Sequence, residues 1–502
     1  MKTYQKVVIA VFALFTAGCT DLITKEVDSQ VVTTTASGSS ADPAGLLLNS
    51  YKDFGGFTDQ AAVYSLYEHV TDELKPPTRG VDWGDNGVWR TLYQHTWDAS
   101  HANILGAWNN LNSNVYRINQ VLAASPTAAQ AAEAKVLRAI NMWFVMDLWG
   151  QVPFRNTTDG PTVLPKVLSR SEAFDFILTD LNDALASPAL ATGGPANENN
   201  IATKSAANFL LARMYLNKAV YKSATPAGPF TFDSGDMDKV IAAVNAIDAA
   251  GFGFEPNFFD NFNKTGTKER ILTVRTDAGT AQNRWFMTLH YDQNPSGWNG
   301  FTTLADFYGK FEAVDKRIGA PSPVTVGSNF YGIKLGFLKG PQVKDDGSAL
   351  VDSRTQKVLD FSSDVPLSGA ATEKGIRAIK YHPANSGAYI MFRYSDAYLM
   401  RAEANFRKNN AGAALTAVNA LRAVRGASTL AGPLTADILL DERGRELYWE
   451  GVRRMDLVRF EKFTVTHDDK TVADPNRVLY CIPQLALDSN PNLKQNAGYT
   501  GN

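Results

Sequence analysis

The segment from residue 442 to residue 460, ERGRELYWEGVRRMDLVRF, is dense in charged side chains and has no purely solvent-facing side. Opposite charges recur three or four residues apart, a spacing that brings helical side chains next to each other. The pairs at this spacing include Glu442 with Arg445, Glu450 with Arg453 and Arg454, and Asp456 with Arg459. Apolar residues cover much of the remaining surface, which is typical of a helix packed inside an assembly of helices. The spacing predicts one continuous helix over 435–460 within a large, mainly α-helical body.

Three carboxylates in this segment, Glu442, Glu446 and Glu450, are four residues apart and would share one helix face. Two of them could serve as a catalytic acid and base. Catalytic carboxylates, however, need an open cleft and separated pKa values, whereas an arginine lies three or four residues from nearly every acid here. The pattern favours a structural ion-pair network over a catalytic site.

The charge balance of the whole chain argues against some functions. In 502 residues, 49 Lys and Arg face 51 Asp and Glu, and the net charge of -2 gives no global field that would attract nucleic acid or acidic lipid. The zinc motif HExxH, the nucleophile motif GxSxG, the Walker phosphate loop and paired CxxC motifs do not occur in the sequence. The six histidines lack the short spacing of metal ligands on one element. We therefore predict neither a metal site nor a cofactor.

The N-terminus has the pattern of an export signal. Two lysines precede a nine-residue apolar run, residues 7–15, which is too short to span a bilayer. Small residues then lead to Cys19, and a cysteine directly after such a peptide is similar to the lipid-modified cysteine of bacterial lipoproteins. We predict a signal peptide over 1–18, followed over 19–40 by the lipidated Cys19 and a flexible tether. The only other cysteine, Cys481, has apolar neighbours and should be a buried, unreactive thiol.

Helical periodicity dominates two parts of the chain. The expected helices span 131–149, 170–186, 203–221, 236–250, 394–408, 411–425 and 435–460. Between residues 226 and 390, clustered Gly and Pro and short alternating pieces replace this periodicity. We predict an N-terminal helical scaffold over 41–225, a loop-rich insertion with a few short strands over 226–390, and a C-terminal helical scaffold over 391–502. Long ordered loops on a rigid frame commonly form binding surfaces.

Two tryptophans lie in turn-forming segments of poor helix and strand propensity. Trp83 is embedded in RGVDWGDNGVW (79–89), and Trp298 in PSGWNG (295–300). Leaving a ring in water costs roughly 25 cal/mol per Å² of apolar area, so an indole in a turn usually has a partner. A sugar would suit, because its C–H faces stack on indole while its hydroxyl groups need a few donors and acceptors. The nearby polar candidates are Arg79, Asp82, Asp85, Asn86 and Asn299.

The alternative for each tryptophan is that its ring folds back over its own loop and fills a small core. For Trp89, Trp97 and Trp108, this structural role competes almost evenly with ligand binding. For Trp83 and Trp298, the surrounding residues favour binding.

Five ordered segments resemble the SusD/RagB family of outer-membrane glycan-binding lipoproteins. They are AEAKVLRAINMWFVMDLWGQVPF (132–154), TKSAANFLLARMYL (203–216), RYSDAYLMRAEA (393–404), the segment 442–460 and IPQLALDSNPNLKQNAGY (482–499). The resemblance implies a tetratricopeptide-like helical-repeat scaffold and a lipid-anchored location on the outer membrane, facing the cell exterior. It also implies a glycan platform of loop aromatics, with Trp83 and Trp298 as first candidates and Trp285 as the second, and a SusC-like TonB-dependent transporter as partner.

These observations favour a non-catalytic surface protein that captures oligosaccharide or polysaccharide and delivers it to the importer. Two alternatives stay open. One is a surface glycoside hydrolase that uses two carboxylates such as Asp82 and Asp306, and the other is a helical-repeat adaptor that binds only protein. The sequence does not name the glycan and leaves calcium binding by the loop 81–86 open.

Overall fold

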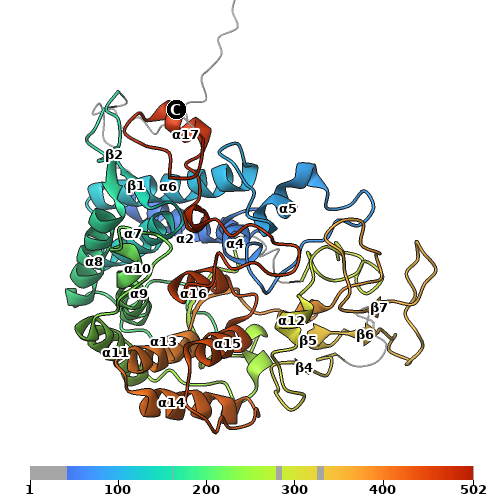
Figure 1. The fold of residues 1–502 in the computed structure, drawn as a ribbon. Helices are drawn as coiled ribbons and strands as arrows, with labels where there is room; N and C mark the ends of the chain where they lie inside the picture. The colour runs from blue at the N-terminus through green and yellow to red at the C-terminus, as the bar shows by residue number, and fades with distance from the viewer. Residues whose placement is uncertain (1–41, 161, 279–284, 325–332, 501–502) are drawn as a thin grey trace, which may run out of the picture. The chain divides into compact units, whose positions relative to one another are not determined.

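Helices form most of the regular structure of the protein (Figure 1). The computed structural model describes residues 42–160, 162–278, 285–324 and 333–500. The predicted signal peptide, Cys19 and the tether lie outside the described residues. The helices before the insertion are α2 (Pro43–Lys52), α3 (Phe54–Phe57), α4 (Val63–Glu68), α5 (Val88–Tyr93), α6 (Ala102–Ala123), α7 (Ala128–Trp149), α8 (Arg170–Ala186), α9 (Lys204–Leu216) and α10 (Lys218–Tyr221), with the 3-10 turn η1 (Asp85–Gly87).

The later helices lie in and after the insertion. They are α11 (Ser234–Ala249), α12 (Ala305–Tyr308), α13 (Tyr394–Arg407), α14 (Ala411–Val424), α15 (Ala436–Leu447), α16 (Arg453–Arg459) and α17 (Gln484–Ser489), with the 3-10 turns η2 (Phe258–Phe262) and η3 (Pro475–Val478).

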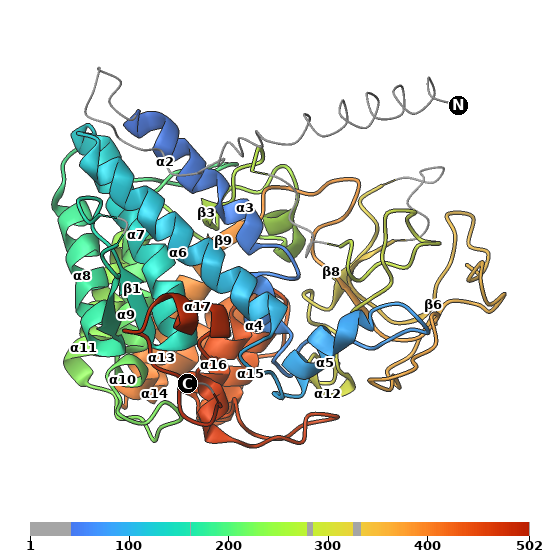
Figure 2. The ribbon, with the colours of Figure 1, turned by 90° about the horizontal axis from the view of Figure 1, so that it is seen from above.

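The long helices pack against one another in chain order. Helix α6 packs on α7, α7 on α8, α8 on α9 and α9 on α11. Helix α11 then contacts α13, which packs on α14 and α15, so the C-terminal helices extend the array begun by the N-terminal ones (Figures 1 and 2). This arrangement confirms the predicted fold class, a tetratricopeptide-like helical scaffold with a loop-rich insertion.

Local sequence signals explain where several helices begin and end. Helix α7 begins with a capping box in which Thr127 and Gln130 satisfy each other's backbone N–H groups, and it ends at Gly150 with a φ of 70°. Helix α8 begins with the same device, formed by Ser169 and Glu172. These helices start from their own residues, and tertiary packing then selects which faces are buried.

The strands are short and pair in small antiparallel sheets. The two-stranded sheets are β1 (Gln151–Phe154) with β2 (Lys166–Ser169), β3 (Arg270–Thr273) with β9 (Ile390–Arg393), and β6 (Gly340–Pro341) with β7 (Asp360–Phe361). A three-stranded sheet has the order β4 (Gly319–Ala320), β5 (Leu335–Leu338), β8 (Arg377–Ile379). Strand β9 runs directly into α13. Its pairing with β3 therefore holds a strand of the insertion against the start of α13.

The predicted continuous helix over 435–460 is wrong. Helix α15 ends at Leu447 and α16 begins at Arg453, and the chain between them turns through positive φ angles at Trp449 (57°) and Gly451 (73°). Two buried carboxylates from the N-terminal part, Glu68 and Glu73, accept the N–H groups of Gly451 (2.5 Å) and Trp449 (3.0 Å). The predicted helix over 203–221 is likewise interrupted, at Asn217. Contacts with residues far away in the sequence override local helix propensity at the turn after Leu447.

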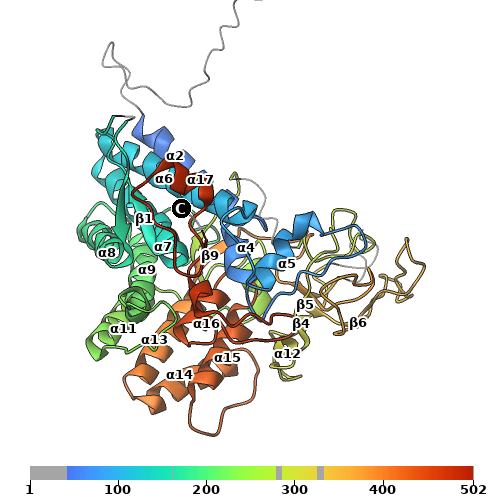
Figure 3. The same ribbon diagram turned by 45° about the horizontal axis from the view of Figure 1, so that its top comes forward.

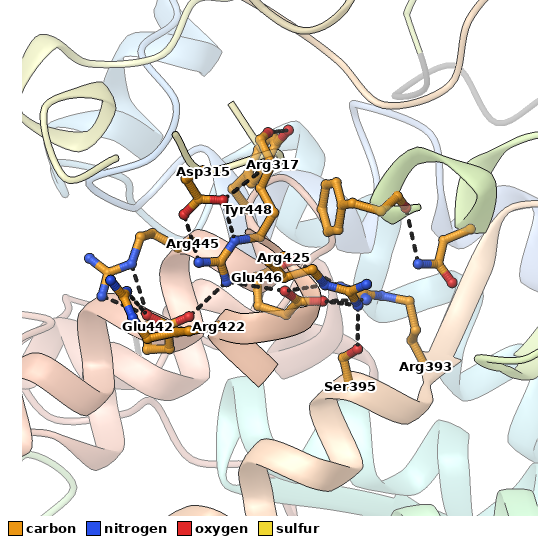
Figure 4. Close-up of polar contacts among 12 residues, drawn as sticks. Asp315, Arg317, Arg393, Ser395, Arg422, Arg425, Glu442, Arg445, Glu446 and Tyr448 are labelled. Carbon is orange, nitrogen blue, oxygen red and sulfur yellow. Dashed lines mark hydrogen bonds and ion pairs between the residues drawn. The ribbon is translucent and has the colours of Figure 1, made fainter. Parts of the chain in front are cut away.

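The ion-pair network predicted for this segment is confirmed, and it is buried (Figure 4). Glu442 contacts Arg317 (2.8 Å), Arg422 (2.8 Å) and Arg445 (2.7 Å), and Glu446 contacts Arg393 (2.8 Å), Arg425 (2.8 Å) and Arg317 (3.2 Å). Burial alone would raise the pKa of both carboxyls, but the arginines lower it, to about 2 for Glu442 and well below its usual value for Glu446. Neither group is available as a catalytic acid.

Some of the predicted pairs within the segment are wrong, because the partners come from elsewhere. Glu442 with Arg445 and Asp456 with Arg459 do pair as expected. Glu450 instead contacts Lys380 (2.6 Å) and Arg393 (2.8 Å), Arg453 contacts Asp72 (2.7 Å) and Arg454 contacts Asp147 (2.8 Å). The break at 448–452 changes which way these side chains point, so the network joins the two halves of the scaffold.

Cys481 is fully buried, and burial raises the pKa of its thiol to about 12. The thiolate, which is the reactive form, is therefore scarce at neutral pH. This confirms the prediction of a buried, unreactive thiol. Among the residues that the structure describes, no helix combines the length and apolar character needed to cross a membrane.

Candidate functional site

Two loops from distant parts of the chain meet beside α5. Lys75 and Thr302 form an antiparallel bridge, in which the N–H of each donates to the carbonyl of the other (2.7 and 3.0 Å). Figures 1 and 3 show the blue segment before α5 beside the yellow and orange loops of the insertion. This bridge places the loop that carries Trp83 next to the loop that carries Trp298.

Trp83 and Trp298 are in direct contact through a hydrogen bond. The indole Nε1–H of Trp83 donates to the carbonyl oxygen of Trp298 (2.9 Å), and the two ring centroids lie 6.3 Å apart. Trp298 is 39% exposed and Trp83 is half-buried. The bond uses the polar atom of one indole to fix the backbone of the other, so both rings are held while part of their apolar surface stays in water.

Further aromatic rings pack against the two tryptophans. Phe301 lies 4.5 Å from Trp83, and Phe286 lies 5.6 Å from Trp298, measured between ring centroids. Trp285 stacks on Phe286 at 4.0 Å with an interplanar angle of 16°. Trp285, Phe286, Trp298 and Trp83 therefore form a continuous row, which we call the aromatic row.

Gly300 is needed for the close approach of Trp83. A Cβ at this position would lie 2.5 Å from Cε2 of the Trp83 ring, and a side chain has no room there. The adjoining Asn299 and Trp83 itself both adopt positive φ angles, of 51° and 63°. The local backbone is thus shaped to bring one indole over the other loop.

Arg79 and Asn299 are buried beneath the loops. Nε of Arg79 donates to the carbonyl of Gly300 (3.2 Å), and the amide of Asn299 donates to the carbonyl of Thr372 (3.0 Å) while accepting from Arg377 (2.7 Å). Burial lowers the pKa of Arg79 to about 10. In this arrangement both side chains fasten the loops that carry the tryptophans.

The other three polar candidates belong to the loop that carries Trp83. Asp82 pairs with Arg354 at 3.0 Å, and both side chains are largely exposed. The exposed Asp85 accepts from the indole N–H of Trp89 (2.6 Å), and Asn86 is exposed with a φ of 53°. These residues offer carboxylate, amide and guanidinium groups near the aromatic row, in which the ring of Trp298 is tilted by 39° against Phe286 and by 43° against Trp83.

The remaining tryptophans of the 89–108 region fill the core. Trp89, Trp97 and Trp108 are all buried. The indole N–H of Trp97 donates to the hydroxyl of Tyr499 (2.7 Å), and Trp108 packs edge-on against Trp149. Of the two roles considered for these three rings, core packing and ligand binding, the structure supports core packing.

Comparison with known families assigns the chain. The family model described as "SusD family" matches residues 249–499, and the model described as "Starch-binding associating with outer membrane" matches residues 51–201. The chain belongs to the SusD family.

Individual SusD-family relatives match the chain over almost its full length. The "Starch-binding protein SusD" of Bacteroides thetaiotaomicron is 24% identical, over 99% of this chain and 98% of that protein. Among solved structures, a SusD-like protein from Bacteroides fragilis superposes with a TM-score of 0.69 at 19% identity, covering 92% of this chain and 98% of that one. Surface glycan-binding protein A from Bacteroides thetaiotaomicron, solved with laminarihexaose, has a TM-score of 0.64 at 17% identity, covering 90% and 98%.

Sequence reasoning on this SusD-family chain missed several residues of the site. Phe286 belongs to the aromatic row, and Phe301 packs against Trp83. Cζ of Arg354 lies 4.1 Å from the centroid of the Tyr291 ring, and Nη1 of Arg354 donates to Asp82. Phe286 adjoins Trp285 in the sequence and was detectable as part of an aromatic pair. Nothing in the local sequence marks Arg354, because its partners lie 63 and 272 positions away.

The two carboxylates considered for a hydrolase have different surroundings in this SusD-family fold. Asp82 is engaged with Arg354, whereas the exposed Asp306 lies on α12, where its charge acts on His467. A glycosidase needs two carboxyl groups on either side of one bond. The contacts of Asp82 and Asp306 give no sign of such a pairing.

Proposed function

We propose that this SusD-family chain is a non-catalytic, lipid-anchored cell-surface protein that captures oligosaccharide or polysaccharide and delivers it to a SusC-like TonB-dependent outer-membrane importer. The observation that carries the proposal is the contact of Trp83 with Trp298, which leaves a partly exposed indole on a rigid support. The names of two relatives, a starch-binding protein and a glycan-binding protein solved with laminarihexaose, support the same class of ligand.

The aromatic row suits a sugar for a physical reason. A pyranose ring presents apolar C–H faces that can shield an indole from water, while its hydroxyl rim needs donors and acceptors at the side. Asp82, Asp85, Asn86 and Arg354 provide such groups near the row. Arg79 and Asn299 act in this proposal by holding the loops in register, since Nε and Nη1 of Arg79 donate to backbone carbonyls and the amide of Asn299 bonds to Thr372 and Arg377.

Replacing Trp298 with alanine is expected to weaken glycan binding by at least about tenfold. A sugar ring that covers roughly 60 Å² of indole contributes about 1.5 kcal/mol, which corresponds to about tenfold in affinity. Retardation of the purified protein in native gels that contain a polysaccharide measures the effect, with starch in the gel as the first probe and soluble laminarihexaose as a competitor. Trp83→Ala should weaken binding too, because it also releases the Trp298 backbone.

A matched control separates this site from general surface effects. Tyr116 on α6 is 37% exposed, close to Trp298 in exposure, and Tyr116→Ala should leave retardation unchanged. Wild-type retardation of the Trp298→Ala and Trp83→Ala proteins would refute the site. Release of products from the same polysaccharides by the wild-type protein would refute the non-catalytic assignment, and failure to bind any glycan would favour a protein-binding adaptor.

The lipid anchor is tested at Cys19, which lies outside the described residues. Cys19→Ser should move the protein from the membrane pellet to the soluble fraction, because the acyl chains are the proposed attachment. Cys481→Ser is the control and should stay with the membrane. A Cys19→Ser protein that still sediments with the membrane would contradict the anchor.

Delivery to an importer predicts in addition that a TonB-dependent barrel co-purifies with the wild-type protein from solubilised membranes.

A further inference from the structure

A histidine and two aspartates converge next to the aromatic row. His290 is fully buried, its Nε2 lies 3.5 Å from Oδ2 of Asp352 and its Nδ1 lies 3.5 Å from Oδ2 of Asp292. One ligand atom from each of the three residues lies within 4.8 Å of the others. His290 belongs to the loop that carries Trp285 and Trp298, whereas Asp352 belongs to the segment that carries Arg354.

The separation of Nε2 from Asp352 fits two ligands of one metal ion better than a hydrogen bond. Hydrogen bonds of this kind span about 2.7–3.2 Å, and the buried Nε2 has no hydrogen-bond partner. Two ligand atoms that each lie about 2.0–2.1 Å from a tetrahedral zinc ion are about 3.3–3.4 Å apart.

We propose that His290 Nε2 and Asp352 Oδ2 bind a divalent transition-metal ion of the zinc class, with Asp292 orienting the imidazole and water completing the coordination. Imidazole nitrogen and carboxylate oxygen are both donors that zinc takes in proteins. Metal binding at Nε2 places the imidazole proton on Nδ1. Nδ1 then gives up the hydrogen bond it accepts from the N–H of Asp292 (3.1 Å) and donates to the Asp292 carboxylate instead. This is the carboxylate–histidine–metal arrangement that fixes the ring of many metal-bound histidines.

The carboxylates of the proposed metal site are already oriented by their surroundings. Oδ1 of Asp352 accepts the N–H groups of Arg354 (2.8 Å) and Thr355 (3.3 Å), and its Oδ2 accepts the hydroxyl of Thr372. Oδ2 of Asp292 accepts the N–H of Ser353 (2.8 Å). Oδ2 of Asp352 and Oδ2 of Asp292 each accept one of these hydrogen bonds and keep a further lone pair. The side chain of Asp292 is 21% exposed, which gives an ion a route to the site.

An ion at the proposed metal site would join two segments that shape the candidate glycan site. His290 and Asp292 lie within the loop between Trp285 and Trp298, and Asp352 lies two residues before Arg354, the partner of Asp82. The same geometry explains why the sequence did not reveal this metal site. The ligands are 62 residues apart, and no short ligand spacing exists to detect.

Zinc binding to the metal-free wild-type protein tests the inference without any glycan. Dialysis against Zn²⁺ followed by metal analysis should give about one equivalent per chain, and the midpoint of thermal unfolding should rise with Zn²⁺. Asp352→Asn and His290→Gln should each abolish the stoichiometric binding. Asp292→Asn should weaken it by about 10–100-fold, the usual effect of losing the group that orients a ligand. His467→Gln, a partly buried histidine elsewhere, is the control and should bind zinc as the wild type does.

Three results would overturn the metal site. They are the absence of bound zinc in the wild-type protein, wild-type affinity in Asp352→Asn, and a preference for Ca²⁺ over Zn²⁺, which would indicate a site without the imidazole. Circular dichroism in metal-free buffer checks that each variant is folded. If Asp352→Asn does not fold, the partly exposed Asp292→Asn decides, and undiminished zinc affinity in that variant would also contradict the site. Failure of glycan binding would leave these outcomes unchanged.

Discussion

Glu446→Ala is expected to lower the free energy of unfolding by about 3–5 kcal/mol, the usual cost of removing one partner from a buried ionic group. Glu446 is fully buried and accepts hydrogen bonds from Arg393 and Arg425 at 2.8 Å, with Arg317 at 3.2 Å. Its removal leaves positive charges facing one another without the carboxylate that separates them. Urea unfolding followed by circular dichroism measures the loss.

An exposed pair provides the matched control. Asp437 contacts Lys462 at 3.0 Å, and both side chains are largely in water, where solvent screens such pairs. Asp437→Ala should leave the urea midpoint nearly unchanged. Equal midpoints for Glu446→Ala and Asp437→Ala would show that the buried network is not important for stability.

The protein is expected to lose stability steeply as the pH falls from about 4.5 toward 2. The pKa of Glu403 and that of Glu442 are lowered from the usual 4.5 to about 2, and that of Glu446 is lowered further, by the arginines around them and against the effect of burial. A folded-state pKa below the unfolded value means that the stabilisation is complete above 4.5 and is lost as the folded protein is protonated. With about 1.36 kcal/mol for one pKa unit, Glu403 and Glu442 each contribute on the order of 3 kcal/mol.

The urea midpoint, measured at pH values from 7 to 3, checks this dependence. Glu442→Gln is the informative comparison, because it removes one of the titrating groups and should flatten the fall below pH 4.5. A wild-type midpoint that stays constant down to pH 3 would contradict the proton linkage, as would an unaltered slope in Glu442→Gln.

The sequence predicted the helical scaffold well because its signals are local. Helix α8 occupies the predicted 170–186, and α13 and α14 end one residue before their predicted ends. Capping residues such as Ser169 act within one turn of the helix they begin, and apolar periodicity is a property of a single element. The charged segment 442–460 was also correctly interpreted as structural, since the sheer density of arginine around its acids requires neutralisation.

The candidate site was predictable only in part. Trp83 and Trp298 were detected because a large ring in a Gly-rich turn is unusual within its own segment. Three features of the site could not be predicted, because they depend on how chain segments more than 200 residues apart converge. They are the hydrogen bond between the two tryptophans, the packing of Phe301 on Trp83, and the contact of Arg354 with Asp82. The burial of Arg79 also follows from that convergence, because its sequence neighbours are polar and turn-forming.

By itself, the sequence determined most of the long helices, the loop-rich character of the insertion, and that the charges of 442–460 are neutralised in an ion-pair network, since each of these follows from spacing and composition along one segment. The tertiary structure decided that this segment breaks after Leu447, because Glu68 and Glu73 satisfy the N–H groups of the turn. It also decided that Trp83 meets Trp298 and that His290 faces Asp352. Such contacts join residues far apart in the chain, and their free energy depends on three-dimensional packing that residue spacing does not encode.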